Sequence, residues 1–574
     1  EVKGNSTVGG LVGRMTEGTI GECSVRGDIF GNYTVGGIVG EYGRSILGEY
    51  TAGFSDCSFI GKVIGRDEVG GLIGYSHDSI DNCRSSGYIL GNSSVGGLVG
   101  QTFYTHNNYP LTIRDCSSDC NVWGNYSVGG LVGYCRLTIE NCSTKGSVLG
   151  IDYVGGLAGE VDRGHINNSN SDSSVRGTSS VGGLIGFSDL GYYRITNSTS
   201  CGGVSGEEDV GGLMGYLSGG VCENCKSTSD VQGTDTDTGG LLGDGECSFT
   251  SCQYDGNVTG NLRVGGFAGT LNEYSDIYNC IVEGKVNGTS RVGGFIGFNP
   301  GAKLYNCSAH ANVFGTQETG GLFGYSYGIA VNTTCYSNVT GGNLTGGLIG
   351  NASRSGFVEP LILDSSDFFG TVKGEYYVGG LTGNSENHMG GGMKFIGCEV
   401  RGDVTGKEIV GGLCGRVHDI TILDCIYEGT VNGTGGFVGG LVGYIIYQSE
   451  IKNSNGSGEI IGHDYVGGCI GDTGIMHSSI LDNLNFQGNV IGKGDNVGGI
   501  IGRTYSDLAD SYFIGNVSGD ENVGGFAGYI GSSVSKCYTF GNVSGSFEVG
   551  GFAGASHGTI EQCISFCDVS GSDH

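Results

Sequence analysis

The chain has 574 residues, including 121 glycines but only 3 prolines, and 58 acidic against 28 basic residues give it a net charge of −30. No basic cluster is available to neutralise phosphates, which argues against nucleic-acid binding. No apolar run approaches the ~20 residues of a membrane-spanning helix. Because the glycines recur at fixed offsets, they indicate a regular fold and not a disordered Gly-rich linker.

The first recurring element is the phrase Val-Gly-Gly-Leu-Val-Gly, or a close variant, which runs from Val8–Gly13 to Val549–Gly554. Its Gly-Gly pair occurs 20 times, and successive pairs lie 26 to 34 residues apart. A repeat of this length is typical of a solenoid, which grows by stacking similar units. Each repeat is therefore expected to form one rung of a coil.

Three candidate strands follow one another in each repeat, as in Val128–Val154. They are Gly-Gly-Leu-Val-Gly, Ile-x-Asn-Cys and Gly-x-Val-x-Gly, each bounded by Gly or Asn. No segment shows a sustained helical period. The sequence predicts an all-β fold, a parallel β-solenoid or three-sided β-helix of about 20 rungs of ~28 residues. Residues 1–574 are expected to form a single continuous solenoid of these repeats, without evident terminal caps.

Extra residues are found almost only between the first and second candidate strands. The longest insertions are Glu41–Ser55, Gln101–Leu111, Asn351–Pro360 and Asn384–Met393. One corner of the coil is therefore expected to tolerate loops. Such loops can mark the interaction face of a repeat protein, and drift at a permissive corner is the alternative explanation.

The second candidate strand carries a recurrent cysteine, which serine replaces in several repeats. These cysteines are expected to stack in a column: Cys23, Cys57, Cys83, Cys116, Cys142, Cys225, Cys252, Cys280, Cys307, Cys335, Cys398, Cys425, Cys537 and Cys563. Stacked rungs would place their Cα atoms ~4.8 Å apart, which permits disulfides. A stack of free buried thiols is the alternative, and the serine replacements favour it.

Cysteines outside the column offer two candidate disulfides, Cys222 with Cys247 and Cys120 with Cys135. The total of 22 cysteines suits an oxidising compartment. An Asn or Asp often precedes the column cysteine and tolerates a left-handed backbone. If these residues point inward, the sequons at Asn141, Asn197 and Asn306 should be unglycosylated.

Other Asn-x-Ser/Thr sequons recur at the same positions of the repeat. The ones predicted to carry N-linked glycans are Asn5, Asn32, Asn92, Asn125, Asn257, Asn287, Asn338, Asn343, Asn432, Asn516 and Asn542. The sequons and cysteines together predict an extracellular or cell-surface location.

Catalytic and metal-binding motifs are missing from the sequence. It contains no His-x-His, His-Glu-x-x-His or Walker pattern, and no nucleophile elbow emerges from it. We therefore predict no catalytic residue, no metal site and no cofactor, with Thr234–Thr238 as one candidate for holding Ca²⁺. A tyrosine often follows the Gly-Gly strand, where it could bind sugars or a partner, although such rings more often stack on one another.

The core Gly-Leu-x-Gly, as in Gly10–Gly13, Gly71–Gly74 and Gly156–Gly159, resembles the GLUG motif over essentially the whole chain. Repeats of this kind occur in large secreted or surface proteins, including adhesins and non-catalytic regions of immunoglobulin-cleaving proteases. The resemblance implies a β-solenoid stalk or adhesive surface, and it carries no catalytic residues over to this chain.

We therefore expect an extracellular, glycosylated structural or adhesive repeat protein, such as a stalk, fibre or surface-filament component, and not an enzyme. Both ends of the sequence fall in third-strand fragments, which predicts a longer parent chain or head-to-tail self-association. Surface glycans or proteins are further expected partners. The alternative is a carbohydrate-binding or polysaccharide-cleaving β-helix, a lyase or hydrolase with acids clustered on one sheet.

Overall fold

A computed structural model describes residues 1–43, 53–103, 111–189, 194–354, 360–387, 392–475 and 478–571. All regular secondary structure in these ranges is β-strand, and the strands of successive rungs pair in parallel. The predicted fold class, an all-β parallel β-solenoid of about 20 rungs, is confirmed. Two units, Glu1–Lys285 and Val286–His574, are described separately below. No helix among the described residues could cross a membrane.

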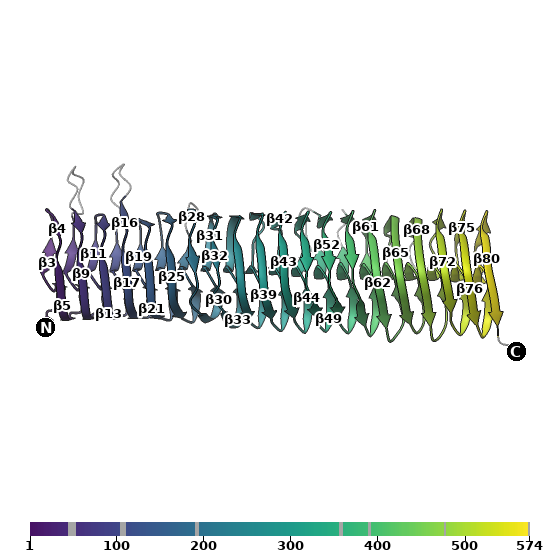
Figure 1. Cartoon of the computed structure of the whole chain (residues 1–574), viewed down its shortest axis with the longest axis horizontal. Coiled ribbons are helices and arrows are strands. Elements are labelled where there is room, and N and C mark those ends of the chain that lie inside the picture. The colour runs from purple at the N-terminus through teal and green to yellow at the C-terminus, as the bar shows by residue number, and fades with distance from the viewer. Residues whose placement is uncertain are drawn as a thin grey trace. The chain divides into compact units, whose positions relative to one another are not determined.

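A typical rung of the first unit contains four short strands. They are β18 (Tyr126–Gly129), β19 (Val132–Cys135), β20 (Thr138–Glu140) and β21 (Ser143–Leu149). Each strand pairs with its counterpart in the next rung, so that copies of one strand lie side by side (Figure 1). The Gly-Gly segment, expected as one strand, is divided between β18 and β19 by a corner.

Rungs of the second unit repeat this order. One of them consists of β73 (Glu521–Gly524), β74 (Ala527–Ile530), β75 (Ser533–Ser535) and β76 (Tyr538–Gly545). The strand β76 pairs in register with β72 (Tyr512–Ser518) of the preceding rung. The same four-strand pattern is therefore found in both units.

The corner between β18 and β19 explains the Gly-Gly pair. A Cβ atom added to Gly129 would lie 1.9 Å from the carbonyl oxygen of Val132, within the same rung. A Cβ atom added to Gly130 would lie 2.1 Å from the carbonyl oxygen of Gly156, in the next rung. No real Cβ atom approaches backbone this closely, so glycine is required at both positions.

The side chains that follow this corner fill the interior. Val128, Leu131 and Val132 are fully buried. The backbone N–H groups of Leu131 and Val132 both donate to the carbonyl oxygen of Leu157 in the next rung, at 2.9 and 3.0 Å. The corner thus satisfies its backbone groups by bonding to the next rung, and it directs apolar side chains inward.

Every rung bends at two residues in the left-handed backbone region, represented by Ser127 (φ 49°) and Asn141 (φ 52°). One precedes the valine of each Val-Gly-Gly phrase, and the other precedes the column cysteine. The second position is usually Asn or Asp, which confirms the prediction for that site. The first holds residues as different as Ser, Thr, Asp, Glu, Arg, Tyr and Phe, so no residue preference predicts it.

The column residue just after the second bend is held by a ladder of hydrogen bonds. The backbone N–H of Cys142 donates to Ser169 Oγ at 3.1 Å, and the N–H of Ser169 donates to Ser198 Oγ at 3.1 Å. The Ser169 hydroxyl in turn donates to the carbonyl oxygen of Asn167 at 2.8 Å. Each column side chain therefore accepts one bond from the preceding rung and donates one within its own.

Cysteine can take the same place because a thiol also donates and accepts hydrogen bonds. The backbone N–H of Cys57 donates to Cys83 Sγ at 3.4 Å, and Cys83 Sγ donates to the carbonyl oxygen of Asp81 at 3.1 Å. Burial raises the pKa of Cys57 to about 11, so its thiol stays protonated. The exchange of cysteine and serine along the sequence follows from this shared bonding.

The insertions predicted between the first and second candidate strands fall largely on residues 44–52, 104–110, 355–359 and 388–391, which lie outside the described residues. Their role as an interaction face stays a prediction.

Substitution of Gly130 by alanine should lower the free energy of unfolding by about 1–3 kcal/mol, because the methyl group collides with the next rung. Urea unfolding followed by circular dichroism measures the change. Gly203→Ala is the matched control, since nothing lies within 4 Å of a Cβ atom there. Equal midpoints for the two variants would contradict the account of the corner.

Removal of the Ser169 hydroxyl should leave the buried N–H of Cys142 without a partner. We expect Ser169→Ala to cost about 1–3 kcal/mol of unfolding free energy, and Ser169→Cys to cost clearly less because the thiol restores both bonds. Denaturant titration of the two variants beside the unsubstituted protein tests this. Similar losses for alanine and cysteine would show that the column needs small volume only.

Candidate functional site

A half-buried stripe of polar and aromatic side chains, which we call the seam, crosses the rungs of each unit. It consists of the left-handed residue before each Val-Gly-Gly phrase and the fifth residue after the first glycine of that phrase. In the first unit, Ser127 Oγ donates to Glu160 Oε2 at 2.7 Å. In the second, Arg291 Nε donates to Glu318 Oε2 at 3.0 Å. Charged side chains of the seam are therefore partly buried.

Aromatic rings of the seam stack along the ladder. Phe187 lies between Tyr153 and Tyr216, with ring centroids 4.3 and 5.3 Å apart and interplanar angles of 29° and 14°. The two faces of the Phe187 ring are thus covered by protein. These three rings support self-stacking over sugar binding for the tyrosine stripe.

Three aspartates of the first unit meet in the seam. One carboxylate oxygen from each of Asp209, Asp237 and Asp244 lies within 4.8 Å of the other two. Asp209 and Asp237 take the left-handed position in successive rungs, and Asp244 is the third residue of β34 (Leu242–Thr250). Sequence reasoning missed Asp209 and Asp244, although alignment of each residue to its Gly-Gly pair would have brought the three together.

The three carboxylates differ in their partners. Asp237 is paired with Arg263 Nη2 at 2.6 Å and accepts a hydrogen bond from Thr270 Oγ1 at 2.5 Å. Asp244 Oδ1 is buried without a hydrogen-bond partner. Burial, with repulsion from the neighbouring carboxylates, raises the pKa of Asp209 to about 7 and that of Asp244 to about 6.

This cluster is the place where the described residues come nearest to a divalent-cation site. Of the candidate calcium segment Thr234–Thr238, Asp237 belongs to the cluster, whereas Asp235 is exposed and outside it. Ca²⁺ takes six to eight oxygen ligands. Asp237 is already engaged by Arg263, so Asp209 and Asp244 are the carboxylates left to bind an ion. Calcium binding here stays a prediction.

Stability should depend on pH through these aspartates. Their pKa values are raised in the folded chain, so the folded state binds more protons than the unfolded state, and stability falls as pH rises through about 6 to 7. Asp209→Asn and Asp244→Asn should flatten this fall and raise the melting temperature at pH 8. Melting curves from pH 5 to 8 test it, and an unchanged slope in both variants would contradict it.

Thirteen of the predicted column cysteines follow a left-handed residue and take the expected corner position, and Cys335 does not. In the register of the strands, Cys335 pairs with Ala309, two residues beyond the corner. Thr333 occupies the column instead, with its N–H donating to Ser366 Oγ at 3.3 Å. The prediction for Cys335 is wrong because threonine, like serine, can make the bonds of the column.

All 22 cysteines are free in the structure. Neither candidate disulfide, Cys222 with Cys247 or Cys120 with Cys135, is formed. The sulfur of Cys252 lies 3.8 Å from that of Cys222. The thiol of Cys120 donates to Ser85 Oγ at 3.5 Å, and that of Cys135 donates to the carbonyl oxygen of Leu137 at 3.3 Å. These thiols are instead engaged in separate contacts.

The asparagines before the column point outward, which corrects the inward alternative. Asn141, Asn197 and Asn306 are exposed. Asn141 Nδ2 donates to Asp115 Oδ1 at 3.2 Å, and Asn332 Nδ2 donates to Asn306 Oδ1 at 2.8 Å, so these amides form a surface ladder. Burial therefore gives no reason for these three sequons to be unglycosylated.

The eleven sequons predicted to carry glycans are all exposed or half-buried. Several stack in register on adjacent rungs. Asn125 Nδ2 donates to Asn92 Oδ1 at 2.8 Å, and Asn542 Nδ2 donates to Asn516 Oδ1 at 2.7 Å. Accessibility is thus met at each site, and glycosylation itself stays a prediction.

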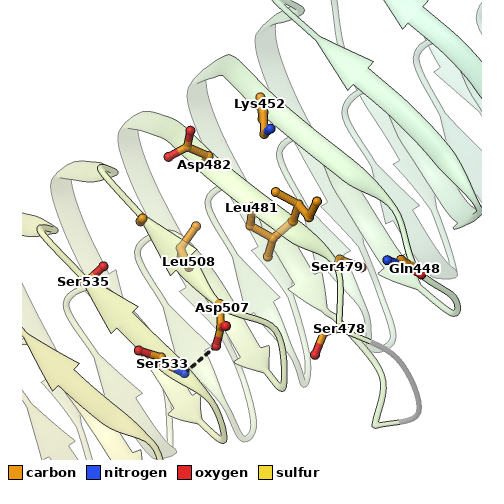
Figure 2. A pocket seen from close by; sticks show the side chains of 12 residues that line it. Gln448, Lys452, Ser478, Ser479, Leu481, Asp482, Asp507, Leu508, Ser533 and Ser535 are labelled. Atoms are coloured by element: carbon orange, nitrogen blue, oxygen red, sulfur yellow. Dashed lines mark hydrogen bonds between the residues drawn. The ribbon is translucent and has the colours of Figure 1, made fainter.

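The second unit has a shallow depression of about 570 Å³ over strands that include β75 and β68 (Ile480–Gly492) (Figure 2). Its polar lining includes Lys452, Asp482 and Asp507 together with several serines. Asp507 Oδ1 accepts hydrogen bonds from Ser532 Oγ at 2.5 Å and from the N–H of Ser533 at 3.0 Å. The depression could hold a polar ligand, with one cation and two carboxylates at its surface.

Comparison with known proteins gives one informative match. The chain is similar to halomucin from Haloquadratum walsbyi, with 35% identity over 167 residues. The match covers 26% of this chain but only 2% of halomucin, so the chain spans a very small part of that protein's length. No protein-family model matches the chain. No solved structure matches it.

Proposed function

We propose that this chain is an extracellular, glycosylated structural or adhesive segment of a repeat protein, forming part of a stalk, fibre or surface filament. The observation that carries the proposal is the outward stacking of sequon asparagines in register, as at Asn92 with Asn125 and Asn516 with Asn542. Stacked sequons would line the surface with sugars, while the interior repeats the same buried columns from rung to rung.

Two further observations support this role. The similarity to halomucin, a protein far longer than the matched region, fits a repeated segment of a large chain. The net charge of −30 keeps a long repeat protein soluble through self-repulsion. The neighbours of such a segment would be further rungs of a parent chain or a second copy stacked head to tail. Surface glycans or proteins are the partners of an adhesive role.

Secretion from a eukaryotic host, followed by glycopeptide mapping, tests the proposal. We expect sugar on most of the eleven sequons, including Asn125 and Asn516, because their side chains are accessible. Binding of the secreted chain to a glycan array and to cell surfaces then measures adhesion. A chain that emerges with these sequons unmodified would contradict the glycosylated role, and a glycosylated chain that binds neither surface would restrict it to a structural one.

The depression over β68 favours one alternative, a carbohydrate-binding or polysaccharide-cleaving protein, because Asp482 and Asp507 both line it. Release of reducing sugar from polysaccharides is the measurement, with Asp482→Asn and Asp507→Asn as variants. Turnover that both variants abolish would favour an enzyme over the structural role.

A further inference from the structure

An exposed apolar patch lies on the outward face of three rungs in the second unit. It includes Ile514 of β72, Phe540 of β76 and Phe566 of β80 (Ile564–Gly571), which are 38%, 58% and 63% exposed. The register places the three side chains in one column. Exposed apolar groups gathered in this way usually mark a contact surface.

This patch is local, because the two preceding rungs hold Gln487 and Ser457 in the same column. Phe540 lies on a strand flanked by β72 and β80, so a paired strand covers each edge of its backbone. Its ring still has no ring contact with Phe566 among the described residues. By contrast, Tyr512 and Tyr538 stack at 5.1 Å and 9° on the same strands. The ring of Phe540 is therefore left available.

A sequon follows Phe540 on the same face. Side chains of a regular strand alternate between its two faces. This order continues across Gly541, although its φ of 144° departs from that of a regular strand. Val543 and Thr539 are buried, whereas Phe540 and Asn542 are exposed, which shows this alternation in β76. Asn542, the sugar acceptor, is thus the next outward-facing residue after Phe540, and only Gly541 separates the two in the sequence.

Bonding within the surface ladder orients the acceptor amide. Asn542 Nδ2 donates one N–H to Asn516 Oδ1 at 2.7 Å. A primary amide has two N–H groups, so the other remains for attachment of a sugar. In that transfer, Nδ2 bonds to C1 of the sugar, the bond from C1 to a lipid-linked diphosphate donor breaks, and one amide proton leaves. The hydrogen bond to Asn516 then fixes the direction in which the sugar extends from Asn542.

We propose that the N-linked glycan of Asn542 packs its first sugar against Phe540, and that the glycan of Asn516 covers Ile514 in the same way. This inference rests on the glycosylation in the proposed function and adds the surface that the sugar occupies. The C–H face of a pyranose ring suits an aromatic ring, and the contact removes exposed apolar area from water. Phe540 and Ile514 are accordingly covered by the chain's own glycans.

The test is the rate at which a peptide N-glycosidase releases the Asn542 glycan from the folded, secreted protein, followed by glycopeptide mass spectrometry. Phe540→Ala should speed release roughly two- to tenfold, the factor that an aromatic contact of this kind represents. Tyr538→Ala is the matched control, because Tyr538 is an exposed ring on the same face but four residues from Asn542. The control should release at the unsubstituted rate.

Three outcomes would overturn the inference. Equal release rates in both variants would refute the contact and leave the glycosylated role standing. An Asn542 without sugar in the unsubstituted protein would refute the contact, and the other sequons in the same map would show whether the proposed function fails with it. Self-association lost in Phe540→Ala, but kept in the sequon variant Ser544→Ala, would assign the patch to a second copy of the chain.

Discussion

The corner at the Gly-Gly pair sets the path of every rung. Backbone atoms of the same rung and of the next one approach to distances that no side chain could share, as the positions of Gly129 and Gly130 show. Because the corner is so tight, the residues after it turn inward and bond to the next rung. The interior columns, the outward asparagines and the seam all take their places from this bend.

At the corner before the column cysteine, a different backbone group needs a hydrogen-bond partner. A left-handed residue interrupts the strand there, and the following N–H cannot join the regular ladder. Side chains of the next rung accept that N–H, and Ser169, Cys83 and Ser366 show that a hydroxyl or a thiol will serve. A disulfide in this column would remove the donor hydrogens on which the ladder depends. The free thiols thus take part in hydrogen bonds with the backbone.

The sequence was sufficient for the fold class, the interior columns and the left-handed asparagines, because Gly-Gly spacing and Asn preference report directly on backbone geometry. It was insufficient where residues of different types can make the same contacts. The prediction placed Cys335 in the column, whereas Thr333 occupies it, because the column accepts either residue type. Asp209 and Asp244 lie in different rungs, and the left-handed residue beside them can be almost any amino acid. The division of the Gly-Gly segment into two strands has no signal beyond the glycines themselves.

The twenty left-handed residues that stand two positions before the Gly-Gly pairs have a consequence for how such a chain can change in length. A residue such as Phe437 or Ile409 in this conformation carries backbone strain of order 1–3 kcal/mol, which only bonding to adjacent rungs can offset. A fraction of a rung would leave that strain unrelieved and shift every later column out of register. Genetic gain or loss of whole repeats avoids both penalties. Outside the corner that tolerates insertions, the rung is therefore the smallest heritable step in size.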